Sequence, residues 1–252
     1  MSVLVERRGP VLVVTIDRPE VSNALNRGVL DGIGAALVAA DADPAVGAVV
    51  LTGTGDRAFC AGLDLAAFAG DGVPLEGGDG GFPVFRRRFA TPLIAAANGH
   101  AVAGGFELLL RCDLVVAAEH AEFGLPEVAR GLVAGYGVSA LPRRVPVQVA
   151  LELALVGNRI TAARAHELGL VNRVVPTGQA LDAAIALGEQ VAANGPLALR
   201  LTKELAYADE DDRAAAMWER ITATVAVALA SDDAREGARA FVEKRPPTWT
   251  GH

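Results

Sequence analysis

The 252-residue chain is mildly acidic, with 30 Asp and Glu against 23 Lys and Arg, and 52% of its residues are hydrophobic. This balance excludes a nucleic-acid-binding platform, because such surfaces depend on clustered Lys and Arg. No apolar run reaches the roughly 18 residues of a membrane span, and no apolar leader follows Glu6, Arg7 and Arg8. A cytoplasmic globular protein with no membrane or nucleic-acid partner is therefore expected.

The first two thirds of the chain alternate short apolar runs with helical periodicity. Four such runs predict strands, at 11–17, 48–53, 92–99 and 113–118. The spacing of apolar residues from about Val29 to Ala40 predicts a helix between the first two strands. This alternation is typical of parallel βαβ units, so the fold class is predicted as α/β.

The remainder of the chain is mainly helical in pattern. Apolar residues recur at helical spacing from Val147 onward, and Gly195-Pro196 interrupts the pattern before a last helical stretch that ends near residue 244. We therefore predict a core at 1–195 that carries the site, and a C-terminal helical region at 196–252. The glycine-rich stretch at 69–83 is predicted to be a mobile loop.

One acidic residue stands in an otherwise apolar stretch, A-V-A-G-G-F-E-L-L-L at 101–110. The pair Gly104-Gly105 predicts a helix start where the backbone approaches a ligand closely, and the positive end of that helix favours negative charge. Glu107 lies in its first turn. A second carboxylate, Glu127, follows Pro126, and the chain between the two acids is long enough to turn back and bring them face to face.

A second backbone donor is predicted in R-A-F-C-A-G-L-D-L at 57–65. Gly62 permits a tight turn there, which frees the amide of Leu63 to point at a ligand. Two convergent amides can hold an oxyanion. Taken singly, each of these motifs also has an ordinary explanation in packing, helix-dipole stabilisation or turn formation. Their order and spacing together point to a functional site.

The cysteines and the arginine run have simpler interpretations. Cys60 and Cys112 lack the spacing of a metal site or a redox pair and are expected to be buried. Cys60 as a nucleophile is disfavoured because no histidine is linked to it in sequence. The run at 86–88, three arginines, is interpreted as a solvated helix face, with contact to a ligand phosphate as the alternative.

Three sequence blocks resemble the signatures of the crotonase family, the enoyl-CoA hydratase/isomerase superfamily. They are F-C-A-G-L-D-L at 59–65, P-L-I-A-A-A-N-G-H-A-V-A-G-G-F-E-L-L-L-R-C-D at 92–113 and F-G-L-P-E-V-A-R-G-L at 123–132. Further similarity at 23–26, 161–175 and 232–245 extends the resemblance over nearly the whole chain. The resemblance implies a spiral core of ββα repeats followed by a C-terminal helical region used for trimerisation.

The resemblance also implies an activity and the residues that carry it. The amides of Leu63 and Gly104 match the family's oxyanion hole, and Glu107 and Glu127 match the two glutamates with which the hydratases hold water. The implied reaction is the reversible addition of water to a 2-enoyl-CoA thioester to give 3-hydroxyacyl-CoA. In it, Glu127 is expected to deprotonate the water, while Glu107 positions the water and delivers a proton to C2. Gly135 matches the position that supports the water or Glu127.

Coenzyme A enters this scheme as part of the substrate, and neither a separate cofactor nor a metal is implied. By the same resemblance, CoA is expected to lie along 22–24 and 61–65, with further contacts from the last helix. The candidate CoA-binding residues are Ser22, Ala24, Ala61, Gly62, Asp64, Leu65, Gly135, Phe241 and Lys244.

A homotrimer, or a hexamer built as a dimer of trimers, is implied by the same resemblance. Ala134 and Tyr136 depart from the family pattern, where proline and a smaller residue are frequent, so the acyl pocket is expected to differ in shape.

Three alternatives to a simple hydratase stay open at this point. An enoyl-CoA isomerase is the first. A specialised hydratase resembling carnitinyl-CoA dehydratase is the second, and the G-G-F-E-L block and the end F-V-E-K-R-P-P-T-W-T-G favour it. A non-catalytic acyl-CoA-binding protein, from another functional class, is the third. Retention of both Glu107 and Glu127 favours hydration over isomerisation, and a binding protein has no need of both acids.

Overall fold

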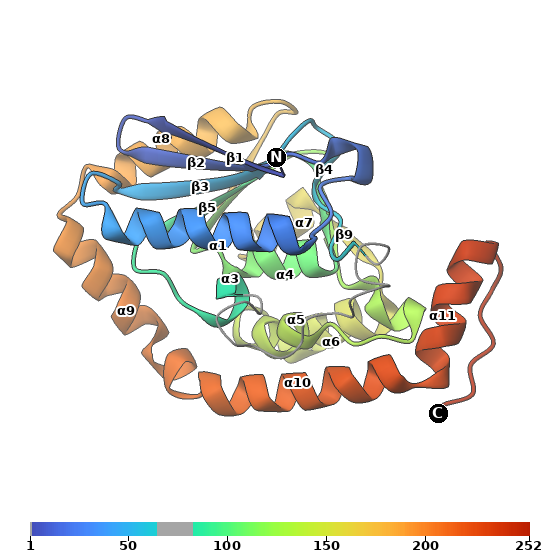
Figure 1. Ribbon diagram of the computed structural model, residues 1–252. Coiled ribbons are helices and arrows are strands. Elements are labelled where there is room, and N and C mark those ends of the chain that lie inside the picture. Colours follow the sequence, from blue (N-terminus) through green and yellow to red (C-terminus); the bar gives the residue numbers. More distant parts are fainter. Residues whose placement is uncertain (1, 65–82) are drawn as a thin grey trace.

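The structure is a computed structural model that describes residues 2–64 and 83–252 (Figure 1). Within these residues, the main sheet has six strands in the order β1-β2-β3-β5-β7-β10. Their bounds are β1 Val3–Arg8, β2 Val11–Ile16, β3 Ala48–Gly53, β5 Leu93–Ala97, β7 Leu114–Ala118 and β10 Arg173–Val175. β1 and β2 form an antiparallel pair, and every other neighbouring pair is parallel.

The chain passes into a smaller second sheet directly after three of these strands. Its order is β4-β6-β8-β9, with β4 at Ala58–Cys60, β6 at His100–Val102, β8 at Glu122–Gly124 and β9 at Arg159–Thr161. β4, β6 and β8 follow β3, β5 and β7 in sequence and run parallel, whereas β9 is antiparallel to β8. Helix α4 (Gly104–Arg111) follows β6, and the 3-10 helix η2 (Pro126–Arg130) follows β8. This repeated winding confirms the predicted α/β class and the ββα spiral.

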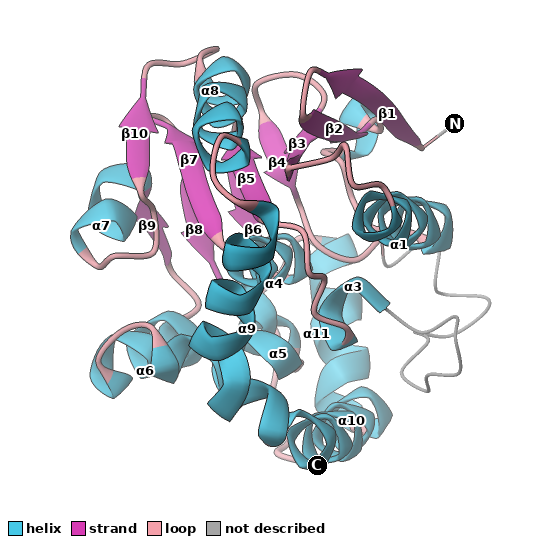
Figure 2. Ribbon diagram, turned by 90° about the vertical axis from the view of Figure 1, so that its left-hand side faces the viewer, coloured by secondary structure: helices cyan, strands magenta, loops and turns pink. Residues whose placement is uncertain are grey.

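Helices cover both faces of the main sheet (Figures 1 and 2). α8 (Ala180–Ala192) packs on one face, where Ala184 and Ile185 meet a separate apolar layer that includes Val50 and Ile94. α1 (Arg27–Ala42) and α4 belong to the larger core on the other face. Because β3 is covered on both sides, all six of its residues are buried, as expected for a central parallel strand.

Shorter elements complete the core around the second sheet. They are η1 Pro19–Val21, α3 Pro83–Arg86, α5 Gly135–Ala140, η3 Leu141–Arg143, α6 Val147–Val156 and α7 Ala162–Glu167. α5 contacts α4, and α6 contacts η2. The two elements that carry the predicted acids, α4 and η2, are therefore each packed against a helix from the middle of the chain.

The last three helices run along the outside of the core (Figure 1). They are α9 Pro196–Asp212, α10 Ala214–Ala230 and α11 Asp232–Glu243. Leu201, Leu205 and Val227 on α9 and α10 are exposed, as are Phe241 and Val242 on α11. No helix in the described ranges combines the length and the apolar character that crossing a bilayer requires.

One strand and one loop differ from the sequence-based expectations. The pattern V-L-V-E-R-R gave no strand prediction, yet it forms β1, the edge strand of the main sheet, in which only Val3 is buried. Edge strands tolerate such charge because they have a solvent-facing side. The loop predicted at 69–83 falls, except for Pro83, outside the described residues.

Candidate active site

Two glycine-containing turns meet at the start of α4. Gly62 has φ +91°, and a Cβ placed on it would lie 3.1 Å from the amide nitrogen of Gly104 and 2.8 Å from the Cβ of Ala103. Gly105 is equally constrained, because a Cβ there would collide with the carbonyl oxygen of Cys60 at the end of β4. Gly62 and Gly105, both singled out from the sequence, are therefore required for close backbone approach, whereas a Cβ on Gly104 would make only ordinary contacts.

The two predicted oxyanion donors lie on these adjoining turns. A Cβ on Gly104 would lie 3.6 Å from the amide nitrogen of Leu63, which shows how near the two segments are. Gly104 is the first residue of α4, where amides have no partner within the helix. In the described part of the chain, Leu25 N bonds to Gly62 O and Asp64 N to Leu25 O, whereas no acceptor is found for Leu63 N or Gly104 N.

A non-glycine residue with a left-handed backbone precedes Gly104. Ala103 has φ 52° and ψ −132° at the N-terminus of α4, and its carbonyl oxygen accepts from the amides of Phe106 and Glu107 at 2.9 and 3.0 Å. Such a conformation is costly for a residue with a Cβ and persists only where the surroundings enforce it. Here β6 and the turn at Gly62 enforce it, and together they fix the direction of the Gly104 amide.

Glu107 projects from the first turn of α4 toward the start of α5. Its Oε1 accepts a 2.7 Å hydrogen bond from the amide of Gly137, and a Cβ on Gly137 would lie 3.4 Å from the Cγ of Glu107. Burial raises the pKa of the Glu107 carboxyl, and the amides of Gly137 and Tyr136 oppose that rise. Amide donors favour the charged form of a carboxyl group, so the two effects compete at this residue.

Glu127 is the second residue of η2, which packs against α11. A Cβ on Gly131 would lie 2.5 Å from the carbonyl oxygen of Asp233, and one on Gly237 would collide with the carbonyl of Arg130. These two glycines let η2 and α11 pack backbone against backbone. Glu127 O accepts from Leu132 N at 3.0 Å, which closes the turn. The C-terminal helix α11 thereby supports the element that carries the second acid.

The two acids interact with each other. Burial raises the pKa of Glu127 to about 8, and the charge of Glu107 is the second cause of the rise. Oε2 of Glu127 is buried and has no hydrogen-bond partner among the described residues. Two carboxyl groups that interact in this way titrate as a pair, and a pKa of about 8 means that Glu127 keeps its proton near neutral pH.

The two segments predicted to contact CoA lie side by side. Ala61 N donates to Ser22 O at 3.1 Å, and Leu25 N donates to Gly62 O at 2.8 Å. Ala24 is buried, and its carbonyl oxygen accepts from Nη1 of Arg18. Arg18 also forms a 2.9 Å ion pair with Asp64, so Asp64 holds the two segments together.

The other predicted CoA contacts are dispersed. Gly135 opens α5, and a Cβ on it would lie 2.7 Å from Ile221 of α10, so it allows the two helices to pack closely. The amide of Gly137, two residues further along, bonds to Glu107. Phe241 on α11 is 59% exposed and lies under the guanidinium of Arg130. Lys244 caps α11 in the left-handed region. Leu65 lies outside the described residues.

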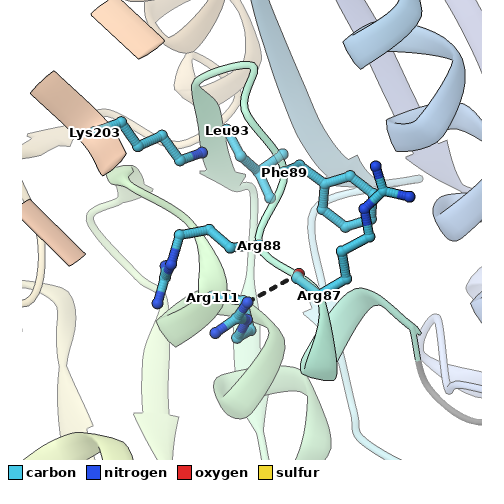
Figure 3. A pocket seen from close by; sticks show the side chains of 6 residues that line it. All are labelled: Arg87, Arg88, Phe89, Leu93, Arg111 and Lys203. Atoms are coloured by element: carbon cyan, nitrogen blue, oxygen red, sulfur yellow. Dashed lines mark hydrogen bonds between the residues drawn. The ribbon is translucent and has the colours of Figure 1, made fainter. Parts of the chain in front are cut away.

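The three consecutive arginines do not form one solvated helix face. Arg87 is exposed, but Arg88 pairs with Glu210 and Asp211 of α9 and lies over the ring of Tyr207. Arg87 and Arg88 line a small pocket with four other residues, Phe89, Leu93, Arg111 and Lys203 (Figure 3). Its volume, about 10 Å³, is that of roughly one water molecule, which is too small for a phosphate group.

Cys60 is fully buried at the end of β4, as predicted, and burial raises the pKa of its thiol to about 12. A thiol with so high a pKa is protonated and a poor nucleophile at neutral pH. Cys112 is also buried and has a raised pKa, again mainly because of burial.

Sequence reasoning missed the contacts of four residues that connect α4, α5 and α9 next to Glu107: Gly137, which bonds to it, and Tyr136, Arg111 and Glu210, which contact one another. The second glycine of A-G-Y-G was a visible signal for Gly137. Arg111 lies one helical turn beyond Glu107 and therefore on the same face of α4, which was a signal too. Nothing near Glu210 in the sequence indicates that it belongs beside Tyr136, because α9 is distant along the chain.

Comparison with known proteins identifies the family. The model of the family described as enoyl-CoA hydratase/isomerase matches residues 6–252. A carnitinyl-CoA dehydratase of Salmonella arizonae is 38% identical over 259 aligned positions, covering 100% of this chain and 99% of the relative. The crystal structure of a carnitinyl-CoA hydratase from Mycobacterium avium has 45% identity and a TM-score of 0.93, with coverage of 100% and 99%. That of an enoyl-CoA hydratase from Mycobacterium tuberculosis H37Rv has 49% identity, a TM-score of 0.78 and the same coverage. The chain belongs to the enoyl-CoA hydratase/isomerase family.

Proposed function

We propose that this hydratase/dehydratase of the crotonase family adds water reversibly across the 2,3 double bond of a 2-enoyl-CoA thioester. The single observation that carries the proposal is the coupled pair Glu107 and Glu127, each with a pKa raised by burial. Oε2 of Glu127, buried and without a partner in the described structure, is the kind of atom that a bound water satisfies. Both acids then act on one water molecule.

The amides of Leu63 and Gly104 are proposed to receive the thioester oxygen. Polarising this carbonyl makes C3 electrophilic and stabilises the enolate-like charge that develops when water attacks. Each such donor is worth roughly 3–4 kcal/mol of transition-state stabilisation in measured cases. The N-terminus of α4 adds a favourable dipole at the same place, because the first turn of a helix carries partial positive charge.

The hydrogen bonds favour a division of labour between the two acids that differs from the sequence-based assignment. Glu107 accepts from the amide of Gly137 at 2.7 Å, which stabilises its anion. Among the described residues, no donor reaches Oε2 of Glu127, so Glu127 keeps its proton more readily. We therefore assign the base that deprotonates water to Glu107, and the acid that protonates C2 to Glu127. In the reverse direction the roles exchange, and water is eliminated.

Coenzyme A is proposed to bind along 22–24 and 61–65, where the hydrogen-bonded segments around Ser22 and Ala61 present backbone groups. The exposed apolar residues of α9, α10 and α11, including Leu205 and Val242, support assembly into a trimer or hexamer.

A specialised substrate, carnitinyl-CoA, is the second candidate. It is favoured by the names of the relatives in Salmonella arizonae and Mycobacterium avium. One feature disfavours it: the stacked rings of Tyr136 on α5, the helix whose amide bonds to Glu107, and of Trp218 on α10 already hold guanidinium groups. Arg86 lies 5.4 Å from the ring centre of Trp218, and Arg111 lies 5.3 Å from that of Tyr136. A quaternary ammonium needs a free aromatic face of this kind.

The experiment is a spectrophotometric assay of purified protein with crotonyl-CoA, whose conjugated thioester absorbance falls on hydration. Carnitinyl-CoA is assayed in parallel for dehydration, and a 3-enoyl-CoA for isomerisation. Hydration is expected in the wild type, with losses of roughly 10²–10⁴-fold in Glu107→Gln and Glu127→Gln, while Glu204→Gln, on the exposed side of α9, retains wild-type turnover. CoA-ester binding without turnover of any of the three would instead identify a non-catalytic binding protein.

A further inference from the structure

Two contacts, one helical turn apart, join α4 to α5. Glu107 Oε1 accepts from the amide of Gly137 at 2.7 Å, and Nη1 of Arg111 lies 3.3 Å from the hydroxyl of Tyr136. Glu107 and Arg111 occupy the same face of α4 because residues four apart in a helix are neighbours. Tyr136 and Gly137 are adjacent on α5. The short helix α5 is therefore fixed to α4 at two neighbouring points, one of which is the acid itself.

The hydroxyl of Tyr136 reaches a cluster of charges formed by Glu210 with Arg88, Arg111 and Arg144, which we call the Glu210 cluster. The hydroxyl lies 3.4 Å from Oε1 of Glu210. The three guanidinium groups lie 3.2, 3.6 and 3.9 Å from the same carboxylate. The side chain of Arg111 is only 6% exposed, and its Nη2 donates to the carbonyl oxygen of Arg87, as Figure 3 shows.

The ring of Tyr136 is held as firmly as its hydroxyl. It stacks on Trp218 of α10 with a 5.8 Å centroid distance and an interplanar angle of 6°, and it lies 6.4 Å from the ring of Phe85. Gly135 permits this packing, because a Cβ there would meet Ile221 and Val225. Tyr136 is 6% exposed. Its side chain is thus held by Trp218 and the Glu210 cluster, while the amides of α5 bond to Glu107.

We propose that Tyr136 is a positioning residue, which holds the α5 amides against Glu107 through its hydroxyl in the Glu210 cluster and its ring on Trp218. This inference rests on the proposed function of Glu107 as the base. Among the described residues, the charged group that interacts with Glu107 is Glu127 from η2, Arg111 lies one turn further along the same helix, and α5 contributes its main-chain amides. α9 and α10, although outside the core, therefore contribute Glu210 and Trp218 to the control of the acid pair.

Tyr136→Phe tests the proposal, since it removes the hydroxyl and leaves the ring stack. Its matched control is Tyr207→Phe. Tyr207 lies under the guanidinium of Arg88, so the control removes a hydroxyl beside the same cluster without touching α5. Glu210→Gln is a second variant that keeps Tyr136 intact and replaces only the charged acceptor. Thermal unfolding of each variant reports that it is folded.

The first readout does not depend on turnover. Titration of the Glu107 carboxyl is followed by ¹³C NMR of glutamate-labelled protein, with its resonance assigned through Glu107→Gln. If the α5 amides are held less firmly, they stabilise the Glu107 anion less. The pKa of Glu107 is therefore expected to rise by about one unit in Tyr136→Phe, and to change in the same direction in Glu210→Gln. Tyr207→Phe is expected to match the wild type. An unmoved titration in Tyr136→Phe, or equal shifts in Tyr136→Phe and Tyr207→Phe, overturns the proposal.

The second readout is kinetic. In Tyr136→Phe, kcat for hydration is expected to fall by about 10-fold with KM within about 2-fold, and the acid limb of the kcat profile is expected to move to higher pH with the titration. If Tyr136 had a purely structural role, Tyr136→Phe would lower the fraction of folded protein without shifting the acid limb of the kcat profile. If the wild type hydrates no enoyl-CoA, the proposed function fails, and the NMR titration still decides whether Tyr136 holds Glu107.

Discussion

Gly62 and Gly104 lie so close that a single methyl group on Gly62 would reach within 3.1 Å of the Gly104 amide nitrogen. The turn that frees Leu63 N and the helix start that carries Gly104 N are thus parts of one backbone contact. This contact is the basis of the proposal that main-chain groups alone form an oxyanion site here. The same contact makes the site sensitive to purely steric substitutions, which leave its charge unchanged.

Gly62→Ala is predicted to impair catalysis more than folding. The added Cβ would collide with Ala103 and displace the Gly104 amide, and φ +91° is unfavourable for alanine. We expect a fall of roughly 100-fold in kcat/KM and a loss of about 1–3 kcal/mol in the free energy of unfolding. Steady-state kinetics and urea unfolding measure the two.

Gly9→Ala is the matched control for this prediction. Gly9 has φ +58° but no atom within 4 Å of an added Cβ, so it carries the same kind of backbone strain at a remote turn. It should lose comparable stability and keep its turnover. Full activity in Gly62→Ala would show that the two turns do not form the oxyanion site.

Glu127 is predicted to make the stability of the folded protein fall as the pH rises. Its pKa of about 8 lies above the ordinary glutamate value of 4.5, so the folded protein holds a proton that the unfolded chain has already released. The stability gained from that proton is complete below the ordinary value and is lost as the pH rises to about 8. The Tm of the wild type should therefore fall by several degrees between about pH 5 and pH 8.

Glu127→Gln removes this titration and should flatten the dependence of Tm on pH over that interval. Glu204→Gln, at an exposed position of α9, should retain the wild-type slope. Calorimetry across the pH range is the measurement. Equal slopes in the wild type and Glu127→Gln would contradict the raised pKa.

Asp64 is predicted to act through its ion pair with Arg18 in joining the two candidate CoA segments. Both side chains are largely buried, at 14% and 16% exposure, and the pair is 2.9 Å long. Asp64→Asn should cost about 2–4 kcal/mol in the free energy of unfolding, since it leaves Arg18 without its partner. It should also raise KM for CoA esters several-fold.

A double-mutant cycle with Arg18→Gln separates the pair from other contacts of either residue. If the ion pair carries the effect, the double variant should be about as impaired as the worse single variant. Additive losses in KM would show that the two residues act independently.

The thiol of Cys60 is predicted to be unreactive despite its position beside the proposed oxyanion site. Burial raises the pKa of its thiol to about 12. Iodoacetamide should therefore leave the native protein unmodified at neutral pH, as mass spectrometry will report, and Cys60→Ala should retain hydration within about 3-fold. Inactivation that tracks alkylation of Cys60 would revive a nucleophilic mechanism.

The sequence predicted those parts of the fold and the site that depend on local patterns. The strands β2, β3, β5 and β7 were visible as apolar runs, and α4 was bounded by Gly104 and Arg111. Glu107 and Glu127 stood out because acids are unusual in such surroundings. Their electrostatic coupling then followed from the winding of the chain, with η2 placed after β8 and supported by α11.

The missed features depend on contacts between distant segments. Arg88 was interpreted as part of a solvated run, but its partner Glu210 lies on α9, and no local pattern links the two. Gly137 was not singled out as a donor to Glu107, although it lies beside Gly135 in A-G-Y-G. Only the orientation of α5, set by Tyr136 against Trp218, decides which amide meets Glu107.

The most direct test of the central claim is a crystal structure of the wild type with butyryl-CoA, a saturated ester that cannot be hydrated. The thioester oxygen is expected about 3 Å from both Leu63 N and Gly104 N, with one water molecule hydrogen-bonded to Glu107 and Glu127 on the side of C3. A thioester oxygen that touches neither amide, or carboxyl groups that bind separate waters away from the acyl chain, would contradict that claim.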